Sequence, residues 1–318
     1  MMDKDNNIVS RSIYYYDLLA VIRKGSKITE EKEAILRSFE RIRKLYEDFL
    51  DAKRKGDETL AKKLLNAVHY ITEKGDYLYV LVDEIVDYKI KFRLVRTRTN
   101  AYPYIDINGE LEKITTKIKG EFDVAEVTHC VIFADKNIMG AEYNSAGARA
   151  TSLSVLFDER DYEVESLKVL NRIDKKAINK LQENKKYKMF QLTIKNSPEI
   201  IKKLRDKNLL GAAFGDFEFD TYTITIKRRI TKNKSGFIPP FGVEEIEDLL
   251  KNNGDEIKSF TVDQGMYTKE VNLLSEKMMV KTDFEYDKDE RILDSAQVYN
   301  KIENSAVKIL IESDGNEE

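Results

Sequence analysis

The spacing of apolar residues changes once along the first hundred positions, and this change limits the folds that the chain can adopt. From Thr29 to Ile71, apolar residues recur every three or four positions, which predicts two helices separated at Lys55-Gly56. From Tyr77 to Thr97 they recur at every second position, which is typical of half-buried strands. The sequence therefore predicts an α+β fold, in which a helical hairpin precedes a mixed or antiparallel sheet.

Capping residues indicate where the two helices of the hairpin begin. Thr29 is expected to cap the first helix, because Glu30 and Glu31 follow it and acidic side chains are favourable in a first helical turn. Asp57 is expected to cap the second helix. Since only Lys55-Gly56 breaks the helical pattern, the two helices are predicted to pack as an antiparallel pair.

The strand predicted from Tyr88 to Thr97 separates apolar from basic side chains. Its apolar face holds Tyr88, Ile90, Phe92 and Leu94. Its opposite face holds Lys89, Lys91 and Arg93. Arg96 and Arg98 continue the apolar face, so the strand is expected to bulge, end or leave the core near Val95.

A second pair of strands leads into the most distinctive loop of the chain. Residues 122–134 and 138–143 are predicted to form a buried hairpin that turns at Asp135-Lys136-Asn137. A polar, small-residue loop follows and ends at Gly147, and Arg149 lies at the head of a predicted short helix. Backbone N–H groups exposed beside an arginine suit an anion or a phosphate group.

The remaining sequence alternates strands and helices without a strict βαβ order. Tyr222, Ile224 and Ile226 are expected to share the buried face of a strand that runs into the basic segment Lys227–Lys234. Pro239-Pro240 then interrupts regular structure. We therefore predict three parts: a strand with the helical hairpin at 1–75, a central nucleic-acid-binding domain at 76–236, and a small acidic α+β part at 237–318.

Charge is distributed unevenly, although the net charge of the whole chain is only −3. Residues 168–210 contain 13 Lys and Arg against four Asp and Glu, and Lys227–Lys234 contains five basic residues and no acidic one. Residues 242–318 contain 20 acidic and nine basic residues. Such asymmetry favours a basic working surface with an acidic part that masks it, contacts a partner or keeps the protein soluble. The alternative is a lysine-rich composition with charge scattered by chance.

Cysteine and histidine usage argues against disulfide or metal chemistry. Cys130 is the single cysteine and lies inside an apolar strand, so it is expected to be a small buried side chain in a reducing cytoplasm. His69 and His129 are far apart and are expected to be packed or hydrogen-bonded rather than metal ligands. No apolar run approaches the ~20 residues of a membrane span, so a soluble intracellular protein is expected. No cofactor is expected, except Mg²⁺ if the protein is a nuclease.

The sequence gives only weak local support for a catalytic function. No nucleophile elbow marks a serine–histidine–acid arrangement, and no phosphate-binding glycine motif is present. A Mg²⁺-dependent nuclease is the alternative to a protein without catalysis, because it needs carboxylates on neighbouring strands and a lysine near the attacking water. Its candidate residues are Asp216, Glu218 and Asp220 with Lys227, or Asp248 with Glu256-Ile257-Lys258.

Binding of nucleic acid accounts for more of the basic residues than catalysis does. A protein that holds DNA without sequence preference needs Lys and Arg side chains along the phosphates. The residues expected to contact phosphate are Arg149, Lys227, Arg228, Arg229, Lys232, Lys234, Lys89, Lys91 and Arg93. A third reading is an adaptor or inhibitor that binds protein through the acidic part and has no affinity for nucleic acid.

The order of these features resembles that of a bacterial antiphage family. The resemblance is carried by the strand Tyr77-Leu78-Tyr79-Val80, the basic strand, Val131-Ile132-Phe133, Ile138-Met139-Gly140 and the loop with Arg149. It covers about half of the chain, from Tyr77 to Arg229, and its motifs are degenerate. Relatives in this family are the A protein of the lambda Rex exclusion system and the B protein of the Kiwa system.

The resemblance implies a role in antiviral defence, through phage resistance or abortive infection. The implied protein is a cytoplasmic, DNA-binding homo-oligomer that recognises phage DNA or phage replication complexes, and a phage protein is a further implied partner. Its implied partner is a small membrane effector encoded nearby, through which it would associate with the membrane. The family is not marked by a catalytic triad or a metal cluster.

Overall fold

The first strand of the chain organises the larger of two compact units. In the described part of the chain, eight strands form one sheet. Its strand β1 (Asn7–Ile22) pairs with three strands that come later in the sequence, namely β8, β9 and β14. Neighbours along the order β14-β1-β8-β7-β4-β3-β2 run antiparallel, and β9 also pairs with β1. The other seven strands are β2 (Tyr70–Ile71), β3 (Tyr77–Val86), β4 (Lys89–Arg98), β7 (Val124–Phe133), β8 (Ile138–Glu142), β9 (Val164–Asn171) and β14 (Met279–Tyr286). This arrangement is the α+β fold with an antiparallel sheet that the sequence predicts.

The computed structural model describes most of this unit and part of the second one. The described residues are 7–72, 75–98, 104–107, 110–114, 123–158, 160–172, 189–195, 198–206, 221–227, 245–246, 248–249, 257–263, 271–272, 278–286 and 292–314.

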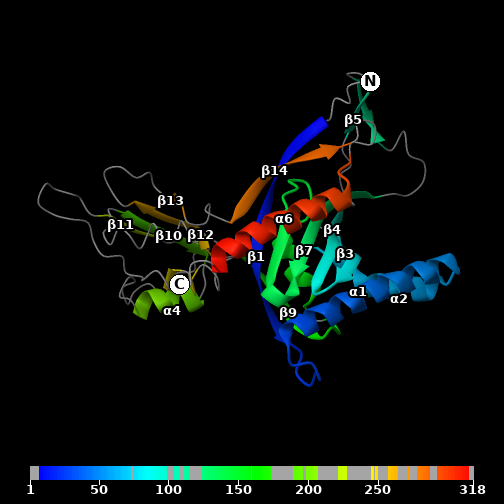
Figure 1. The fold of residues 1–318 in the computed structure, drawn as a ribbon, viewed down its shortest axis with the longest axis horizontal. Helices are drawn as coiled ribbons and strands as arrows, with labels where there is room; N and C mark the ends of the chain where they lie inside the picture. The colour runs from blue at the N-terminus through cyan, green and yellow to red at the C-terminus, as the bar shows by residue number, and fades with distance from the viewer. Residues whose placement is uncertain are drawn as a thin grey trace, which may run out of the picture. The chain divides into compact units, whose positions relative to one another are not determined.

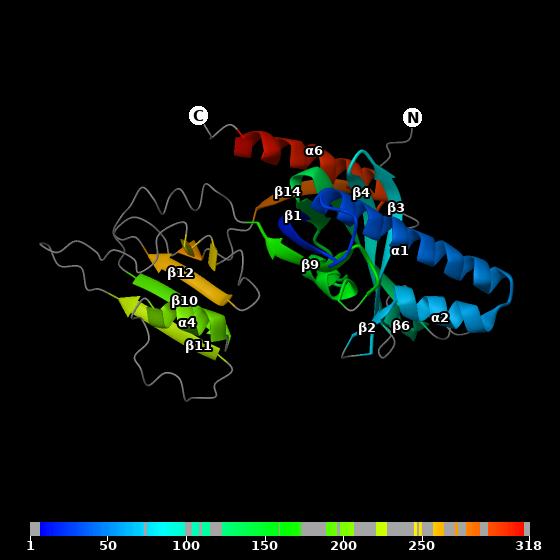
Figure 2. The ribbon, with the colours of Figure 1, turned by 90° about the horizontal axis from the view of Figure 1, so that it is seen from below.

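Two layers of helix cover the two faces of the large sheet. The helical pair α1 (Glu31–Arg54) and α2 (Glu58–Val68) lies on one side, and α6 (Ser295–Asp314) lies across the other (Figures 1 and 2). On the first face Phe39 of α1 lies between Phe92 of β4 and Phe157, with ring centroids 5.1 and 5.8 Å away. All three rings are fully buried, so this cluster is the centre of the core.

The second face of the sheet is shaped to receive α6. The Tyr15 hydroxyl donates to the carbonyl of Ile302 at 2.8 Å and lies 2.7 Å from Ser305 Oγ. At Gly140 of β8, an added Cβ would lie 2.5 Å from Ile302 Cγ2, so the helix approaches too closely for any side chain there. The sequence predicts an α+β part at 237–318 but neither β14 nor the sheet face that this helix covers.

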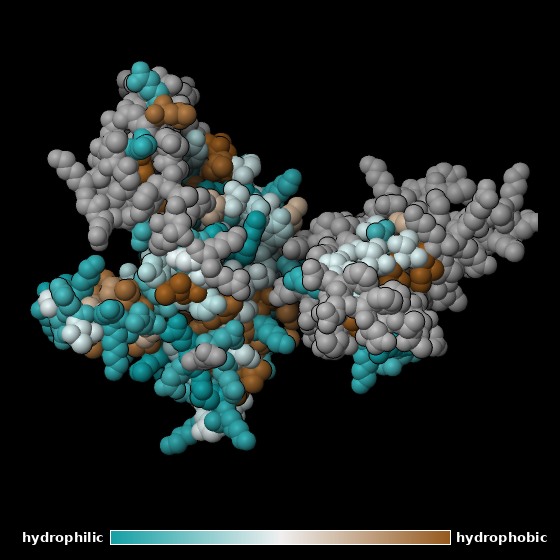
Figure 3. Space-filling model, turned by 180° about the vertical axis from the view of Figure 1, so that it is seen from behind, coloured by the Kyte–Doolittle hydropathy of each residue, from teal (hydrophilic) through white to brown (hydrophobic). Residues whose placement is uncertain are grey.

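The helical hairpin and the buried strand hairpin follow the predictions closely. The Asp57 side chain accepts a hydrogen bond from the Leu60 N–H at 2.9 Å, which confirms the predicted cap of α2. The cap of α1 is Glu30 rather than Thr29. Between β7 and β8 the chain turns through η2 (Ala134–Lys136) and Asn137, whose φ of 51° is left-handed. Figure 3 shows that the projecting end of the helical hairpin is mostly hydrophilic.

The second compact unit is inserted between two strands that both pair with β1. It comprises Leu170–Met278, between β9 and β14, whereas the first unit comprises Met1–Val169 and Met279–Glu318. Its sheet has the order β11-β10-β12-β13 and runs antiparallel. Its elements are β10 (Met189–Lys195), α4 (Pro198–Asp206), β11 (Thr221–Lys227), β12 (Ile257–Asp263) and β13 (Val271–Asn272).

The observed division differs from the three parts predicted from the sequence. Because β1 pairs with β8 and β14, residues from all three predicted parts contribute to one sheet. The boundaries at 75/76 and 236/237 therefore do not separate compact units. A further small sheet joins β5 (Tyr104–Ile107) to β6 (Glu110–Lys113). No helix within the described residues is both long enough and apolar enough to cross a membrane.

The carboxyl end of α2 depends on an arginine from a distant part of the chain. Arg160 donates to the carbonyls of Asn66, Ala67 and His69, each at 2.8 Å, and so satisfies carbonyl groups that the helix leaves open. His69 lies against Tyr79, with ring centroids 4.4 Å apart, as a packed imidazole. Its Nδ1 is buried and has no hydrogen-bond partner among the described residues.

Acid is expected to destabilise the protein partly through His69. Burial and the nearby positive charge of Arg160 lower the pKa of His69 from 6.5 to about 4. Between these two pH values the unfolded chain binds a proton at His69 that the folded protein does not, so stability falls as the pH falls through this window. His69→Phe keeps the stacked ring and should lose less Tm than the parent protein between about pH 6.5 and 4. Thermal unfolding followed by circular dichroism tests this; equal pH dependence in both proteins would contradict it.

Candidate functional site

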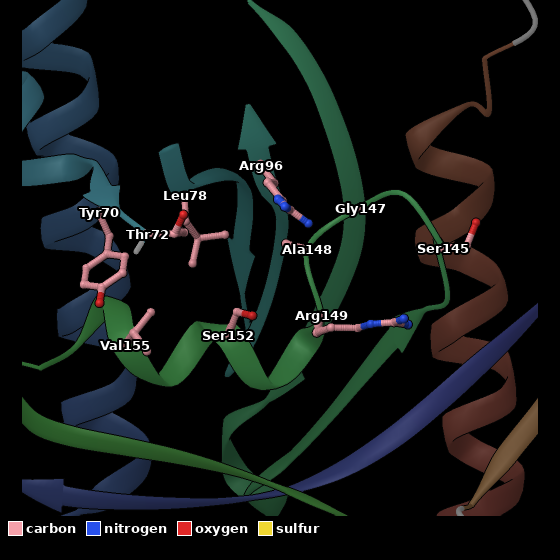
Figure 4. A pocket seen from close by; sticks show the side chains of 10 residues that line it. All are labelled: Tyr70, Thr72, Leu78, Arg96, Ser145, Gly147, Ala148, Arg149, Ser152 and Val155. Carbon is pink, nitrogen blue, oxygen red and sulfur yellow. The ribbon is translucent and has the colours of Figure 1, made fainter. Parts of the chain in front are cut away.

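A cavity opens on the large unit beside the loop that the sequence singled out. Its volume is about 440 Å³, which lies in the range of small-ligand sites. Three segments contribute: the region from β2 to the start of β3, the end of β4, and the loop after β8 together with η3 (Ala150–Leu156). The lining residues, shown in Figure 4, are Tyr70, Thr72, Leu78, Arg96, Ser145, Gly147, Ala148, Arg149, Ser152 and Val155.

Side chains of β7 and the loop itself hold the loop in place. The Asn144 amide donates to the Val127 carbonyl at 2.9 Å, while its side-chain oxygen accepts from the Ala146 N–H at 3.1 Å. The Thr128 hydroxyl donates to the Ala148 carbonyl at 2.9 Å. A Cβ at Gly147 would lie 2.5 Å from that hydroxyl oxygen, so glycine is required by close approach. The loop is therefore a fixed wall of the cavity.

Two arginines from different elements line the cavity. Arg149 is exposed at the start of η3, and its guanidinium carbon lies 4.7 Å from the centroid of the Tyr143 ring. Arg96 reaches from β4 toward Gly147 and Ala148 (Figure 4). Its guanidinium donates to Asp76 Oδ2 at 2.9 and 2.5 Å, so part of its charge is balanced. Arg149 therefore provides the less compensated positive charge.

The lining chemistry suits an anion that carries several oxygen acceptors. Guanidinium groups donate to phosphate or carboxylate oxygens, and the hydroxyls of Thr72, Ser145 and Ser152 supply further donors. Tyr70, Leu78 and Val155 give the opposite wall an apolar character. A phosphate group with its sugar attached fits both the size and the polarity of such a cavity.

The basic residues predicted to share a face of β4 pair with carboxylates, although the Lys89 side chain stays 46% exposed. Lys89 and Lys91 lie 3.2 and 3.4 Å from Glu303 of α6, and Lys91 also lies 2.8 Å from Glu84. Arg93 makes a two-pronged contact with Asp83, at 2.9 and 2.6 Å. Glu303 of α6 thus reaches Lys89 and Lys91, whereas the partner of Arg93 is Asp83 of the neighbouring strand β3. The charges of these three residues are therefore partly balanced, and their contact with phosphate stays a prediction.

The other predicted site residues fall largely outside the described part of the chain. This applies to Arg228, Arg229, Lys232, Lys234, Asp216, Glu218, Asp220 and Glu256. Lys227 is the last residue of β11, and Asp248 lies 3.2 Å from Lys203 of α4. Among the residues that the structure describes, no group of three or more His, Cys, Asp or Glu side chains is arranged to hold a metal ion.

Arg96 is the cavity residue that sequence reasoning did not select. The signal was present, because Arg96 falls on the apolar side of its strand, where the core was expected to end. The pairing of β4 with β7 continues without a register shift from Lys89 to Arg98, so the strand does not bulge near Val95. Instead, Arg96 reaches the cavity and its charge is met by Asp76.

A buried polar network begins at the last residue of β8, just before the loop. The Glu142 side chain is fully buried and lies 2.7 Å from Arg11 Nη1 and 2.5 Å from His129 Nδ1. Burial by itself would raise the pKa of Glu142, but its contacts with His129 and Arg11 outweigh burial and hold that pKa below its ordinary value. His129 is thus hydrogen-bonded, as predicted. Cys130 beside it is fully buried, and burial raises the pKa of its thiol.

Comparison of the sequence with models of protein families finds no match, and comparison with curated proteins finds none either. The argument for a binding site therefore rests on the residues of this chain.

Proposed function

We propose that this protein is a cytoplasmic antiphage-defence component that binds DNA without strong sequence preference. In this proposal one phosphate group of the DNA, with its sugar, enters the cavity between Arg96 and Arg149. The basic segment Lys227–Lys234 supplies further phosphate contacts. The defence role, the homo-oligomer and the partner effector come from the resemblance to the Rex and Kiwa proteins.

The observation that carries the DNA-binding proposal is the meeting of Arg149, Arg96 and three hydroxyl side chains around one cavity. Contacts to phosphate fix the position of DNA but read no base sequence. A cavity of about 440 Å³ accepts a terminal or unpaired nucleotide but not a duplex. DNA with a single-stranded end is therefore expected to bind more tightly than a blunt duplex of equal length.

Replacement of Arg149 by alanine is expected to weaken DNA binding about tenfold, because one phosphate contact is lost. Fluorescence anisotropy with a labelled, tailed duplex between about 50 and 300 mM salt measures this, and the slope of log affinity against log salt should fall by about one. Removal of the exposed Arg149 side chain should leave the Tm nearly unchanged, since an exposed cation–π contact contributes only about 0.5–1 kcal/mol.

Arg54→Ala is the matched control, because Arg54 is an exposed arginine on α1 that pairs only weakly with Asp51 at 3.2 Å. It removes the same charge far from the cavity and should leave affinity unchanged. Equal losses in the two variants would show that only net charge matters and would contradict the cavity as the binding site.

A triple variant in which Lys227, Arg228 and Arg229 become glutamate is expected to abolish DNA binding. Unchanged binding would exclude the basic segment.

The same DNA-binding measurement distinguishes the proposed function from its two alternatives. Cleavage of the DNA that appears only with Mg²⁺, and that Asp220→Ala removes, would favour the nuclease. Absence of DNA binding at every salt concentration would leave the protein-binding adaptor.

A further inference from the structure

Three side chains from three elements form a hydrogen-bonded chain on the sheet face that α6 covers. His129 Nε2 lies 2.8 Å from Ser295 Oγ, and His129 Nδ1 lies 2.5 Å from Glu142 Oε1. We propose that Ser295 is a nucleophile, that His129 is its general base, and that Glu142 positions the histidine. The proposed activity is hydrolysis of neutral carboxylic esters, at a site separate from the cavity that is proposed to bind DNA.

The surroundings of His129 favour the tautomer that this role needs. Glu142 is a fully buried carboxylate that can only accept hydrogen bonds while ionised, so Nδ1 carries the proton toward it. Arg11 donates to the same carboxylate at 2.7 Å, and the backbone N–H of His129 donates to it at 3.2 Å. Nε2 then presents its lone pair to the Ser295 hydroxyl and can accept the hydroxyl proton.

Packing also fixes the plane of the imidazole. The Tyr299 ring meets His129 edge to face, with centroids 5.5 Å apart and planes at 77°. The Tyr299 hydroxyl is tied to Asp83 Oδ2 at 2.5 Å. Since Tyr299 lies one turn after Ser295 on α6, the helix that carries the serine also carries the wall of the histidine site.

The position of Ser295 at the start of a 20-residue helix suits an alkoxide and a developing oxyanion. Asp294 caps the helix, because its side chain accepts from the Gln297 N–H at 2.8 Å and its carbonyl accepts from the Val298 N–H at 3.1 Å. The N–H groups of Ser295 and Ala296 have no acceptor within the helix, so they can donate to the oxygen of a bound carbonyl.

Exposure and charge indicate the substrate class. Ser295 is half-buried, and its neighbours Asp294 and Ala296 are exposed, so the hydroxyl lies at the edge of the covered face. The Asp294 carboxylate beside it disfavours an anionic substrate such as a phosphodiester. A neutral ester avoids this repulsion.

The chemistry balances with water as the co-reactant. Ser295 Oγ attacks the carbonyl carbon of the ester while its proton moves to His129 Nε2. The bond between the carbonyl carbon and the alcohol oxygen breaks, and that proton passes to the departing alcohol. Water then attacks the acylated serine, gives a proton to His129, and releases the carboxylic acid as Ser295 regains its proton.

Labelling of the full chain with a fluorophosphonate tests the proposal, because this probe modifies only activated serines and fluoride leaves as the phosphorus–oxygen bond forms. Peptide mass spectrometry should locate the adduct on Ser295. Ser295→Ala should abolish labelling and lower p-nitrophenyl acetate hydrolysis at least about 100-fold. Ser305→Ala, which removes a hydroxyl on the same helix that bonds to Tyr15, should leave both unchanged.

The Glu142→Gln variant tests whether Glu142 acts in the reaction or only stabilises the fold. At a temperature where the variant is folded, kcat for p-nitrophenyl acetate should fall while KM stays the same, because the histidine is less well positioned in the reaction. An unlabelled parent protein, or an adduct on another serine, would overturn the proposal whatever the variants do. Ser295→Ala should bind DNA like the parent, so failure of the two proposals can be told apart.

Discussion

Phe39→Ala is expected to lower the free energy of unfolding by about 3–5 kcal/mol. Phe39 is fully buried on α1 and touches Phe92 of the sheet and Phe157, so its removal leaves a cavity where three parts of the core meet. The rings around it belong to a sheet strand and to a loop fixed by other contacts, and they can close that space only in part. Chemical denaturation with urea, followed by circular dichroism, measures the loss.

Phe49→Ala on the same helix is the matched control. Phe49 is only half-buried and lies against Tyr46 at the outer part of α1, with centroids 5.9 Å apart. Its removal should cost clearly less. If the two variants lose equal stability, the packing of α1 on the sheet is not centred on Phe39.

Glu142→Gln is expected to lower the free energy of unfolding by about 3 kcal/mol at pH 7, because Arg11 and His129 lose a buried charged partner. The difference in free energy of unfolding between the variant and the parent should become smaller at acidic pH. The pKa of Glu142 is held below its ordinary value of 4.5, so its contribution is fully present above that pH and is lost as the pH falls through the folded-state pKa. Urea denaturation of both proteins across about pH 3–7 measures the difference.

Glu303→Gln is the comparison for this variant. Glu303 also pairs with basic side chains between α6 and the sheet, but its side chain is 19% exposed and Lys89 is 46% exposed. Such a pair contributes at most about 1 kcal/mol. A loss at Glu303 as large as that at Glu142 would show that burial does not decide the strength of these contacts.

Local sequence patterns predicted the individual helices and strands better than they predicted which of these elements contact one another. Asp57, the apolar spacing along α1 and the turn at Asn137 depend on neighbours in sequence, and the structure confirms each of them. The face of β4 with Lys89, Lys91 and Arg93 was predicted to lie free for nucleic acid. Alternation shows only that these side chains share a face; it does not show that Glu303 of α6 and Asp83 of β3 pair with them.

The candidate sites show the same limit. The loop that ends at Arg149 could be found from its small residues and its single arginine. Arg96 joins it because β4 and β7 are neighbours in the sheet, which no local pattern states. His129 and Glu142 lie on the two strands of the predicted hairpin, but Ser295 is 166 residues beyond His129 and no motif joins it to them, so only the docking of α6 brings the serine there.

The pairing of β1 with β14 has a consequence for how the protein is made. During translation β1 leaves the ribosome before the inserted unit, whereas β14 and α6 follow only after the whole inserted unit has been synthesised. Until then residues 7–14 of β1 lack their partner β14, and Tyr15, which is buried in the finished protein, lacks the cover of α6. An open strand edge readily pairs with other chains, so the nascent protein depends on protection from aggregation until β14 and α6 emerge.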